Sequence, residues 1–243
     1  MASLIRHDAA AEDILKDVAQ TLAKAHARGG TWKSAADEKL GPLVALAEKI
    51  AERLAKARKD LVPLENAIEA EDELADPLIG HVSDEIWNAV GRPASDPILS
   101  VIFPGGIAYY TAGADDEQPD RMELLAELLE MGLHPKLDDK VARKHAADVR
   151  KEGTKYGALV EKARVPRARV KLLEKMQIAL AHAAHVELTN LKRRYKSDGH
   201  SDADIHAVIP GYSRASSKKQ SASAPPVTPG TTPTNGGSGS TPT

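Results

Sequence analysis

The chain has 243 residues, and its 33 lysines and arginines nearly balance its 35 aspartates and glutamates, which gives a net charge of −2. It contains no cysteine, so disulfides, thiolate metal sites and cysteine nucleophiles are excluded. No stretch approaches the roughly 18 apolar residues of a membrane span, and the N-terminal sequence turns acidic before any apolar run develops. We therefore expect a soluble, cytoplasmic protein without a signal peptide or a membrane partner.

The apolar residues are mainly Ala, Leu, Val and Ile, and only 3% of the chain is aromatic. This composition favours closely spaced helices over a sandwich or barrel, which would use more aromatic and β-branched residues. We predict an all-α fold, namely a bundle of long antiparallel, coiled-coil-like helices with an irregular aromatic crossover segment. Residues 1–214 are expected to form the helical domain, with an acidic part over 1–135 and a basic long-helix part over 136–196. Residues 215–243, rich in Ser, Thr, Pro and Gly, are expected to form a disordered tail.

The first half of the chain has the clearest helical pattern. A helix is predicted over residues 8–28, ended by Gly29. Ser34 followed by Asp37 has the spacing of a capping box, so the next helix is expected to begin there. An apolar seam with alternating steps of three and four, typical of a coiled coil, then comprises Leu40, Leu43, Ala47, Ile50, Leu54, Ala57, Leu61, Leu64 and Ile68. Pro63 lies inside this seam and predicts a kink or a break.

The second half contains three further predicted helices. One opens at Pro119, a residue favoured in the first helical turn, and ends at Gly132. Two longer ones cover residues 136–165 and 166–196. Pro166 separates these two, and the sequence leaves open whether it begins a hairpin or only kinks one very long helix.

Half of the chain's eight aromatic residues gather around one Pro-Gly-Gly turn. They are Trp87, Phe103, Tyr109 and Tyr110. Trp87 belongs to a predicted short helix over 83–90, and the other three are interpreted as pinning an irregular crossover against it. A small β-hairpin of residues 101–103 and 107–110 is an alternative for the crossover itself. A functional alternative is that Tyr109 and Tyr110 form an exposed anchor for a partner, because tyrosine is favoured at interface hot spots.

Charge is unevenly distributed along the chain. Residues 1–135 carry 25 acidic and 13 basic side chains, whereas residues 136–243 carry 10 acidic and 20 basic ones. The main basic clusters contain Arg164, Arg167, Arg169, Lys192, Arg193 and Arg194. Three interpretations stay open: solvated faces that pair weakly within one molecule, an acidic region that docks on the basic helices of another copy, and phosphate contacts to nucleic acid.

Motifs for catalysis or phosphate binding are weak. There is no G-x-S-x-G elbow, and the glycines at 105–106 are not followed by the Lys-Ser/Thr pair of a phosphate-binding loop. The acidic runs at 71–73 and 115–117 lack apolar surroundings and are interpreted as solvated surface. Gly153 and Gly157, four residues apart, leave two interpretations open: they let another helix approach closely, or they only weaken the helix locally.

The histidines raise the question of a metal site. If Pro166 began a hairpin, His182 and His185 would lie opposite His145 and Asp148, and four such ligands would suit a divalent metal. Both histidines of the later helix project away from its apolar stripe, however, so they are interpreted as surface residues. We expect no metal and no cofactor.

Together these features predict a non-enzymatic helical scaffold or protein-interaction module that uses segregated acidic and basic helices. The expected partner is a second copy of the chain or another protein. The alternative function is nucleic-acid binding through the basic C-terminal helices. No catalytic residue is proposed, and the candidate interaction residues are Trp87, Phe103, Tyr109, Tyr110, Arg164, Arg167, Arg169, Lys192, Arg193 and Arg194.

Overall fold

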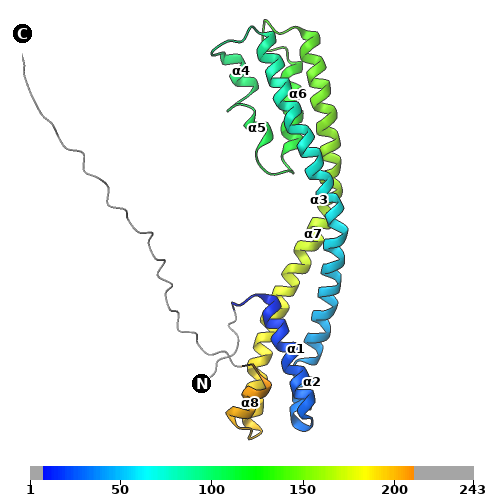
Figure 1. Cartoon of the computed structure of the whole chain (residues 1–243), viewed down its shortest axis with the longest axis vertical. Coiled ribbons are helices and arrows are strands. Elements are labelled where there is room, and N and C mark those ends of the chain that lie inside the picture. Colours follow the sequence, from blue (N-terminus) through cyan, green and yellow to red (C-terminus); the bar gives the residue numbers. More distant parts are fainter. Residues whose placement is uncertain (1–7, 211–243) are drawn as a thin grey trace, which may run out of the picture.

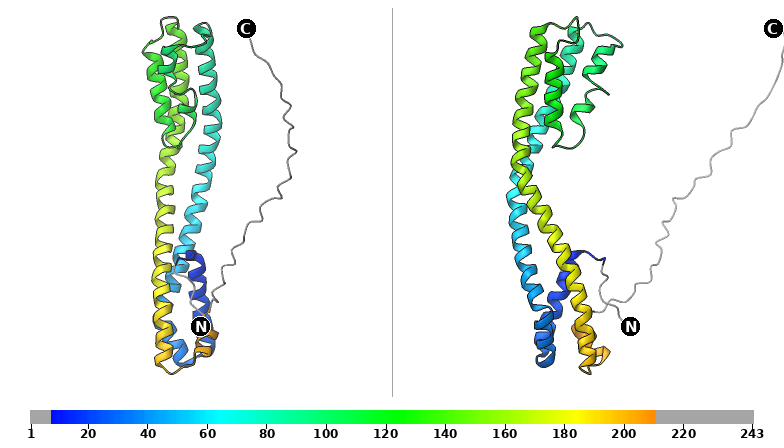
Figure 2. Two further views of the ribbon diagram at one scale, coloured as in Figure 1. Left: turned by 90° about the vertical axis from the view of Figure 1, so that its left-hand side faces the viewer. Right: turned by 180° about the vertical axis from the view of Figure 1, so that it is seen from behind.

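The computed structural model describes residues 8–210, and within this range every regular element is an α-helix. Two helices dominate, α3 (Gly41–Ala89) and α7 (Asp139–Ser197), which run antiparallel along the length of the molecule (Figure 1). Shorter helices gather at the two ends of this pair, and in the middle no other described helix lies beside α3 and α7 (Figure 2). The prediction of an all-α bundle is confirmed.

Three short helices cover one end of the long pair: α1 (Ala11–Arg28), α2 (Gly30–Lys39) and α8 (Asp202–Val208). Their shared core with α3 and α7 includes Val18, Leu40, Leu188 and Ile205. Gly29, with φ of +71°, separates α1 from α2 in a conformation that favours glycine, so the first predicted helix end is confirmed.

The predicted capping box is wrong. Ser34 lies inside α2, where its hydroxyl donates a hydrogen bond to the Gly30 carbonyl oxygen at 3.2 Å. The helix that carries most of the apolar seam, α3, begins instead at Gly41, because Pro42 is well suited to a first helical turn.

Three more helices cover the other end: α4 (Pro97–Ile102), α5 (Ala108–Thr111) and α6 (Gln118–Glu130). Helix α6 packs directly on α7, and glycine makes this possible. A Cβ atom on Gly153 would lie 3.0 Å from Cβ of Met122, and one on Gly157 would lie 3.4 Å from Cβ of Pro119. Of the two interpretations of these glycines, the close helix approach is therefore confirmed, and so is Pro119 in the first turn of α6.

Helix α3 is continuous through Pro63 and Pro77, so the chain does not break in the apolar seam. An interior proline costs about 3 kcal/mol, and packing against α7 on both sides of Pro63 outweighs that cost. Every residue of the seam is buried or half-buried. The short helix predicted over 83–90 is not separate; it forms the last turns of α3, which Gly91 ends with φ of +94°.

Helix α7 is also a single element of 59 residues that passes through Pro166. Of the two alternatives left open by the sequence, the hairpin is therefore wrong. At 1.5 Å per residue, this helix is about 90 Å long and links the two ends of the molecule without an intervening loop.

The aromatic segment between α3 and α6 forms short helices rather than the alternative β-hairpin, because residues 97–102 and 108–111 are helical. Asp96 determines where α4 begins: its Oδ1 accepts hydrogen bonds from the backbone N–H groups of Ile98 at 2.8 Å and Leu99 at 3.0 Å. This is a typical N-cap, and Pro97 directly after it favours the first helical turn.

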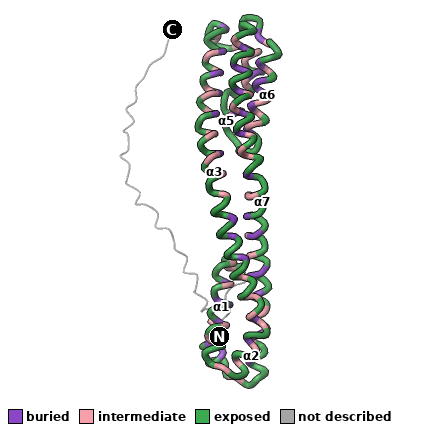
Figure 3. The backbone as a smooth tube through the Cα atoms, turned by 90° about the vertical axis from the view of Figure 1, so that its right-hand side faces the viewer, coloured by how far each residue is buried: buried purple, intermediate pink, exposed green. Residues whose placement is uncertain are grey.

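In the middle of the molecule no other described helix packs beside α3 and α7, although Asp115 in the loop before α6 reaches Arg167. We call this region the waist and define it as residues 49–65 of α3 and 162–178 of α7. Its core is small, formed by Leu54, Ala57, Val170 and Leu173, with Leu61 packed against them. Figure 3 shows the buried residues of this region on the facing sides of the helices and exposed residues on the outer sides.

None of the helices within residues 8–210 combines the length and hydropathy that a membrane crossing requires. The predicted tail at 215–243 lies outside the described residues, so its expected disorder stays a prediction.

Candidate interaction surfaces

The waist concentrates positive charge. Four acidic side chains lie there, Glu52, Asp60, Glu65 and Glu174. They are outnumbered by eleven basic side chains: Lys49, Arg53, Lys56, Arg58, Lys59, Lys162, Arg164, Arg167, Arg169, Lys171 and Lys175. Because α3 and α7 are antiparallel, the basic first half of α3 lies beside the basic middle of α7. Sequence reasoning missed the contribution of α3 because it counted charge over residues 1–135 as one acidic block. Residues 53–59 nevertheless contain four basic side chains, Arg53, Lys56, Arg58 and Lys59.

Negative charge concentrates on one side of the waist along the rod. We call residues 66–161 the acidic end, because they carry 20 aspartates and glutamates against nine lysines and arginines. These residues include the second half of α3, all of α6 and the start of α7. The molecule therefore has a basic waist beside an acidic end, instead of an acidic and a basic half.

Some of these charges are paired within the molecule. Arg167 donates from Nε to Oε1 of Glu65 at 2.8 Å and from Nη2 to Oε2 at 2.5 Å, and its Nη2 also lies 3.1 Å from Oδ2 of Asp115. These hydrogen bonds hold the pKa of Glu65 below its ordinary value. Arg58 pairs with Glu174 at 2.8 Å. The interpretation of weak intramolecular pairing thus accounts for part of the charge pattern.

The six predicted basic residues form two groups on one helix. Arg169 and Lys192 are 23 positions apart on α7, or about 35 Å along its axis, so they do not share a patch. Arg164 pairs with Glu161 at 3.3 Å, and Arg194 pairs with Asp198 at 3.3 Å. Within the first group, Arg169 lines a groove of about 470 Å³ together with Arg53, Lys56, Leu172, Leu173 and Met176.

The four aromatic candidates are not equivalent. Tyr110 is 0% exposed, and its hydroxyl donates to the Ile102 carbonyl oxygen at 2.6 Å. Burial raises the pKa of Tyr110 to about 12. The alternative that Tyr110 is an exposed anchor is therefore wrong, because this side chain belongs to the core. Tyr109 is 41% exposed and lies under the guanidinium of Arg121, which is 5.5 Å from the ring centroid.

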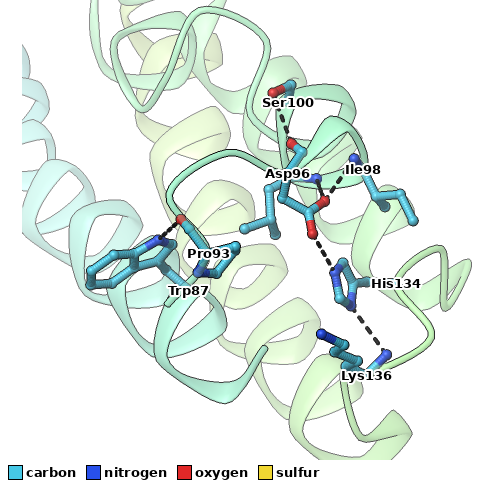
Figure 4. A network of polar contacts seen from close by, with 8 residues as sticks. Trp87, Pro93, Asp96, Ile98, Ser100, His134 and Lys136 are labelled. Atoms are coloured by element: carbon cyan, nitrogen blue, oxygen red, sulfur yellow. Dashed lines mark hydrogen bonds and ion pairs between the residues drawn. The ribbon is translucent and has the colours of Figure 1, made fainter. Parts of the chain in front are cut away.

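Trp87 and Phe103 line a groove of about 440 Å³ between the end of α3 and α4. The indole Nε1 of Trp87 donates to the Pro93 carbonyl oxygen at 3.1 Å (Figure 4). Phe103 packs edge-to-face on Tyr110, with ring centroids 6.0 Å apart. The three aromatic residues of the crossover thus pack on each other, and only Phe103 lines the groove that Trp87 also borders.

A polar network fixes this groove to the loop before α7. His134 is buried, its Nε2 lies 3.1 Å from Oδ2 of Asp96, and its Nδ1 accepts a hydrogen bond from the Lys136 backbone at 3.1 Å (Figure 4). Because Nδ1 is an acceptor, Nε2 carries the proton that points at Asp96. Hydrogen bonds from the Leu99 backbone and from His134 lower the pKa of Asp96, which stays ionised.

Sequence reasoning missed a polar layer between α3, α6 and α7. Burial and the neighbouring Glu152 raise the pKa of Glu71, while Lys155, 2.8 Å from Glu152, lowers the pKa of Glu152. The interpretation of residues 71–73 as solvated surface is wrong for Glu71, whose side chain is only 14% exposed. The α7 residues beside it, Glu152 and Lys155, are distant in the sequence, and nothing in the local sequence signals this contact.

Two side chains of α3 extend this polar layer toward α6. The Tyr156 hydroxyl donates to Oδ1 of Asp72 at 3.2 Å, and Nε2 of Gln118 donates to Oδ1 of Asp76 at 2.9 Å. Burial raises the pKa of Asp76. Three helices are therefore joined by polar contacts at the level where α6 begins.

The histidines considered as metal ligands are far apart. His145 and His182 are 37 positions apart on α7, or about 55 Å. His145 is buried beside Glu85, with Nε2 2.9 Å from Oε2, and burial lowers its pKa. Residues 8–210 contain no group of three or more His, Asp or Glu side chains that could hold a metal ion.

Comparison of the chain with models of protein families, with curated proteins and with solved structures finds no match. The function proposed below therefore depends on the charge, burial and geometry of this chain alone.

A second aromatic cluster lies at the opposite end of the molecule. Trp32 stacks on His200 with ring centroids 4.0 Å apart, and the Tyr195 hydroxyl donates to the Trp32 carbonyl oxygen at 2.8 Å. Arg28 lies 5.0 Å from the Trp32 ring. Sequence reasoning missed this cluster because 163 residues separate Trp32 from Tyr195.

Proposed function

We propose that the chain is a cytoplasmic, non-enzymatic helical scaffold that self-associates by placing the acidic end of one copy against the basic waist of another. The observation that carries this proposal is the segregation of opposite charge into two neighbouring regions of one rod. Complementary charged regions attract over distances up to the Debye length, which steers association and selects the register of docking.

Most of the waist's positive charge is available to a partner. Among the residues that the structure describes, Arg58, Arg164 and Arg167 are the basic side chains of the waist that form ion pairs. The other eight basic side chains of the waist make no ion pair within residues 8–210. Such isolated exposed charges contribute little to the stability of one molecule, so their concentration favours a role between molecules.

The continuity of the two long helices supports a contact between copies. We propose that α3 and α7 pair as an antiparallel coiled coil through the apolar seam, and that the aromatic segment of residues 97–111 packs across the far end. Because both helices run on without a loop, the acidic end of one copy is held away from most of its own waist. Two copies would therefore meet through different surfaces, and such a heterologous contact closes into a ring or continues as a filament.

Light scattering coupled to size-exclusion chromatography tests self-association at low and at high salt. We expect a mass above that of the 26.0 kDa monomer at low salt and a return toward the monomer at high salt. A monomer under both conditions, at concentrations on the order of tens of micromolar, contradicts the proposal.

A charge-reversal variant locates the contact. Lys56→Glu combined with Arg169→Glu is expected to abolish the salt-dependent assembly, because both side chains line the same waist groove. The matched control is Lys192→Glu combined with Arg193→Glu, on the same helix α7 but outside the waist. Equal loss of assembly in both variants would show only a general effect of net charge.

The basic waist also favours a second candidate function, nucleic-acid binding, because eleven lysines and arginines in one band would neutralise several phosphates. The acidic end would oppose a long polyanion, so we rank this function second. A gel-shift titration with a mixed-sequence duplex and a single strand tests it, and no complex at low salt removes it.

A further inference from the structure

Helix α7 carries a second set of apolar side chains outside the buried seam that it shares with α3. We call this set the outer stripe; it consists of Val165, Leu172, Met176, Ala179, Ala183 and Val186. Two of them, Leu172 and Met176, border the groove that Arg53, Lys56 and Asp60 of α3 also line. All six are exposed, with Val165 at 66%, Leu172 at 58% and Met176 at 42%. From Leu172 onward they follow steps of four and three, and Val165 lies seven residues before Leu172, so all six fall on one helical face. The buried seam of the same helix, with Val170 and Leu173, lies on a different face.

An apolar stripe with this spacing is the pattern by which one helix packs on another. In the waist α3 already covers one face of α7, and no other described helix lies beside the pair there (Figure 2). The part of the outer stripe in the waist therefore has the spacing of a helix-packing seam but no described helix to pack on. Its continuation, Ala183 and Val186, is exposed at the level where α1 packs on α7. Contiguous exposed apolar surface of this kind marks an interaction site.

The charges beside the stripe restrict what can cover it. At 100° per residue, Lys162 and Arg169 lie along one edge of the stripe, and Lys171 and Lys175 lie along the other. These four side chains make no ion pair with any residue that the structure describes. Two copies of the same stripe would place positive charge against positive charge, so symmetric stripe-to-stripe pairing is disfavoured. The fitting partner is an amphipathic helix with acidic residues beside its apolar face.

The chain's own segments outside the structure cannot supply that helix. Residues 1–7 and 211–243 contain no aspartate or glutamate, and the second segment carries Arg214, Lys218 and Lys219. Both segments would add positive charge to an already basic surface.

Helix α6 has the required chemistry. On its outer face Leu124 is 39% exposed, Leu128 is half-buried, and Met131, directly after the helix, is 66% exposed. These three residues follow steps of four and three, as do Leu172, Met176 and Ala179 of the outer stripe. Asp120 and Glu127 lie beside them and form no ion pair within residues 8–210.

We infer that the outer stripe of α7 binds the outer face of α6 of a second copy, with Leu128 opposite Met176 and with Asp120 and Glu127 near the lysines of the stripe. This inference rests on the proposed self-association and names the two surfaces that make the contact. Both surfaces are present on every copy at different places along the rod, so each copy can bind one neighbour through α6 and another through α7.

Substitutions on the two surfaces test the inference in the full-length chain. Leu172→Gln combined with Met176→Gln removes the stripe, and Leu124→Gln combined with Met131→Gln removes the α6 face. All four side chains are exposed, so the fold should tolerate these changes. Each double variant should weaken self-association at low salt by more than about tenfold, the effect of losing two buried apolar anchors. The control Ile178→Gln changes an apolar residue of α7 that is 49% exposed but lies off the stripe, and it should associate like the unmodified chain.

Mixing the two double variants gives the sharpest result. Each retains one intact surface, so the mixture should form one-to-one dimers and no larger species, while each variant alone stays monomeric. If the mixture stays monomeric, or if either variant alone assembles like the unmodified chain, the named surfaces are wrong.

Cross-linking supplies an independent readout, because the chain has no cysteine of its own. Leu128→Cys and Met176→Cys lie at the centres of the two surfaces, so oxidation of a mixture of these variants should give a mixed disulfide in either helix direction. Ile178→Cys in place of Met176→Cys should give much less.

The outcomes separate the two proposals. An unmodified chain that is monomeric at low salt contradicts both. Self-association that survives the stripe and α6 variants contradicts only the inference. If the stripe variants instead lose binding of a nucleic acid or of an unrelated acidic helix while self-association is unchanged, the occupant named here is wrong.

Discussion

Arg167 and Glu65 form a bidentate ion pair between α7 and α3, with Nε 2.8 Å from Oε1 and Nη2 2.5 Å from Oε2. The pair lies at the border between the waist and the acidic end. It joins the two long helices at a level where Arg167 also contacts Asp115, in the loop before α6. An arginine in this geometry presents two parallel N–H groups to both carboxylate oxygens, which makes the pair stronger than a single contact.

Arg167→Gln should lower the free energy of unfolding by about 1 kcal/mol at pH 7, since both partners are partly exposed and solvent screens their attraction. The pKa of Glu65 is lowered in the folded state, so this stabilisation is present above the ordinary pKa of a glutamate and disappears as pH falls through the folded value. Urea denaturation at pH 7 and at about pH 3 checks this. Arg169→Gln is the control, because Arg169 has no ion pair among the described residues, and equal losses in both variants would contradict the role of the pair.

Gly153→Ala should destabilise the protein by about 1–3 kcal/mol, because the new methyl group would lie 3.0 Å from Cβ of Met122 and would push α6 away from α7. Gly80→Ala is a matched control inside α3, where an added Cβ meets nothing within 4 Å. That variant should gain about 0.5–1 kcal/mol from the better helix propensity of alanine. Thermal denaturation of the two variants should therefore shift in opposite directions. A shift of the same sign would show that α6 does not press on Gly153.

Tyr110→Phe should cost about 1–2 kcal/mol, because it leaves the buried carbonyl oxygen of Ile102 without its 2.6 Å hydrogen bond. Tyr109→Phe should change stability by less than about 0.5 kcal/mol, as expected of an exposed side chain. Chemical denaturation compares the two. Equal effects would mean that the crossover is not held by the Tyr110 hydroxyl.

Glu71→Gln should stabilise the protein at pH 7 by about 1 kcal/mol, because burial beside Glu152 makes ionisation of Glu71 unfavourable. The raised pKa of Glu71 explains why the substitution stabilises the protein. The folded state holds the proton more tightly than the unfolded state, so the unmodified chain loses stability as pH rises from the ordinary glutamate pKa to the raised one. Denaturation curves between about pH 4 and pH 8 should show this loss in the unmodified chain and a smaller loss in the variant. If the variant and the unmodified chain lost the same stability between these pH values, the raised pKa of Glu71 would be contradicted.

The sequence predicts the parts of the fold that local chemistry determines. The steps of three and four identify the seam of α3, Gly29 and Gly91 identify helix ends, and Gly153 indicates a place where another helix can approach. Each of these depends on a backbone conformation or a spacing that neighbouring residues specify. The all-α class follows from them.

The sequence misleads where tertiary packing outweighs local preference. Pro63 and Pro166 are helix breakers in isolation, yet both lie inside continuous helices because long facing surfaces hold those helices together. Ser34 has the side chain of a cap but lies inside α2. Glu71 belongs to an acidic run, yet it is mostly buried because α7 packs over it.

The sequence indicates which residue types could form an interaction surface, but it does not indicate which of those residues lie together in the fold. Counting charge along the chain separates Lys56 from Arg169, although the antiparallel helices bring both to one groove. The same count joins Arg169 to Lys192, which one continuous helix keeps about 35 Å apart. Tyr109 and Tyr110 are adjacent in sequence, but only the second has its hydroxyl buried against a backbone carbonyl.

The small core of the waist has a dynamic consequence. The two ends have separate and larger apolar clusters, whereas Leu54, Ala57, Val170 and Leu173 are the main buried contacts between them. Amide hydrogens near these four residues should exchange with deuterated solvent sooner than those of either end, because local opening there breaks few contacts. The two ends would then melt as separate cooperative units, and a partner bound along the outside of α7 would slow exchange most at the midpoint of the rod.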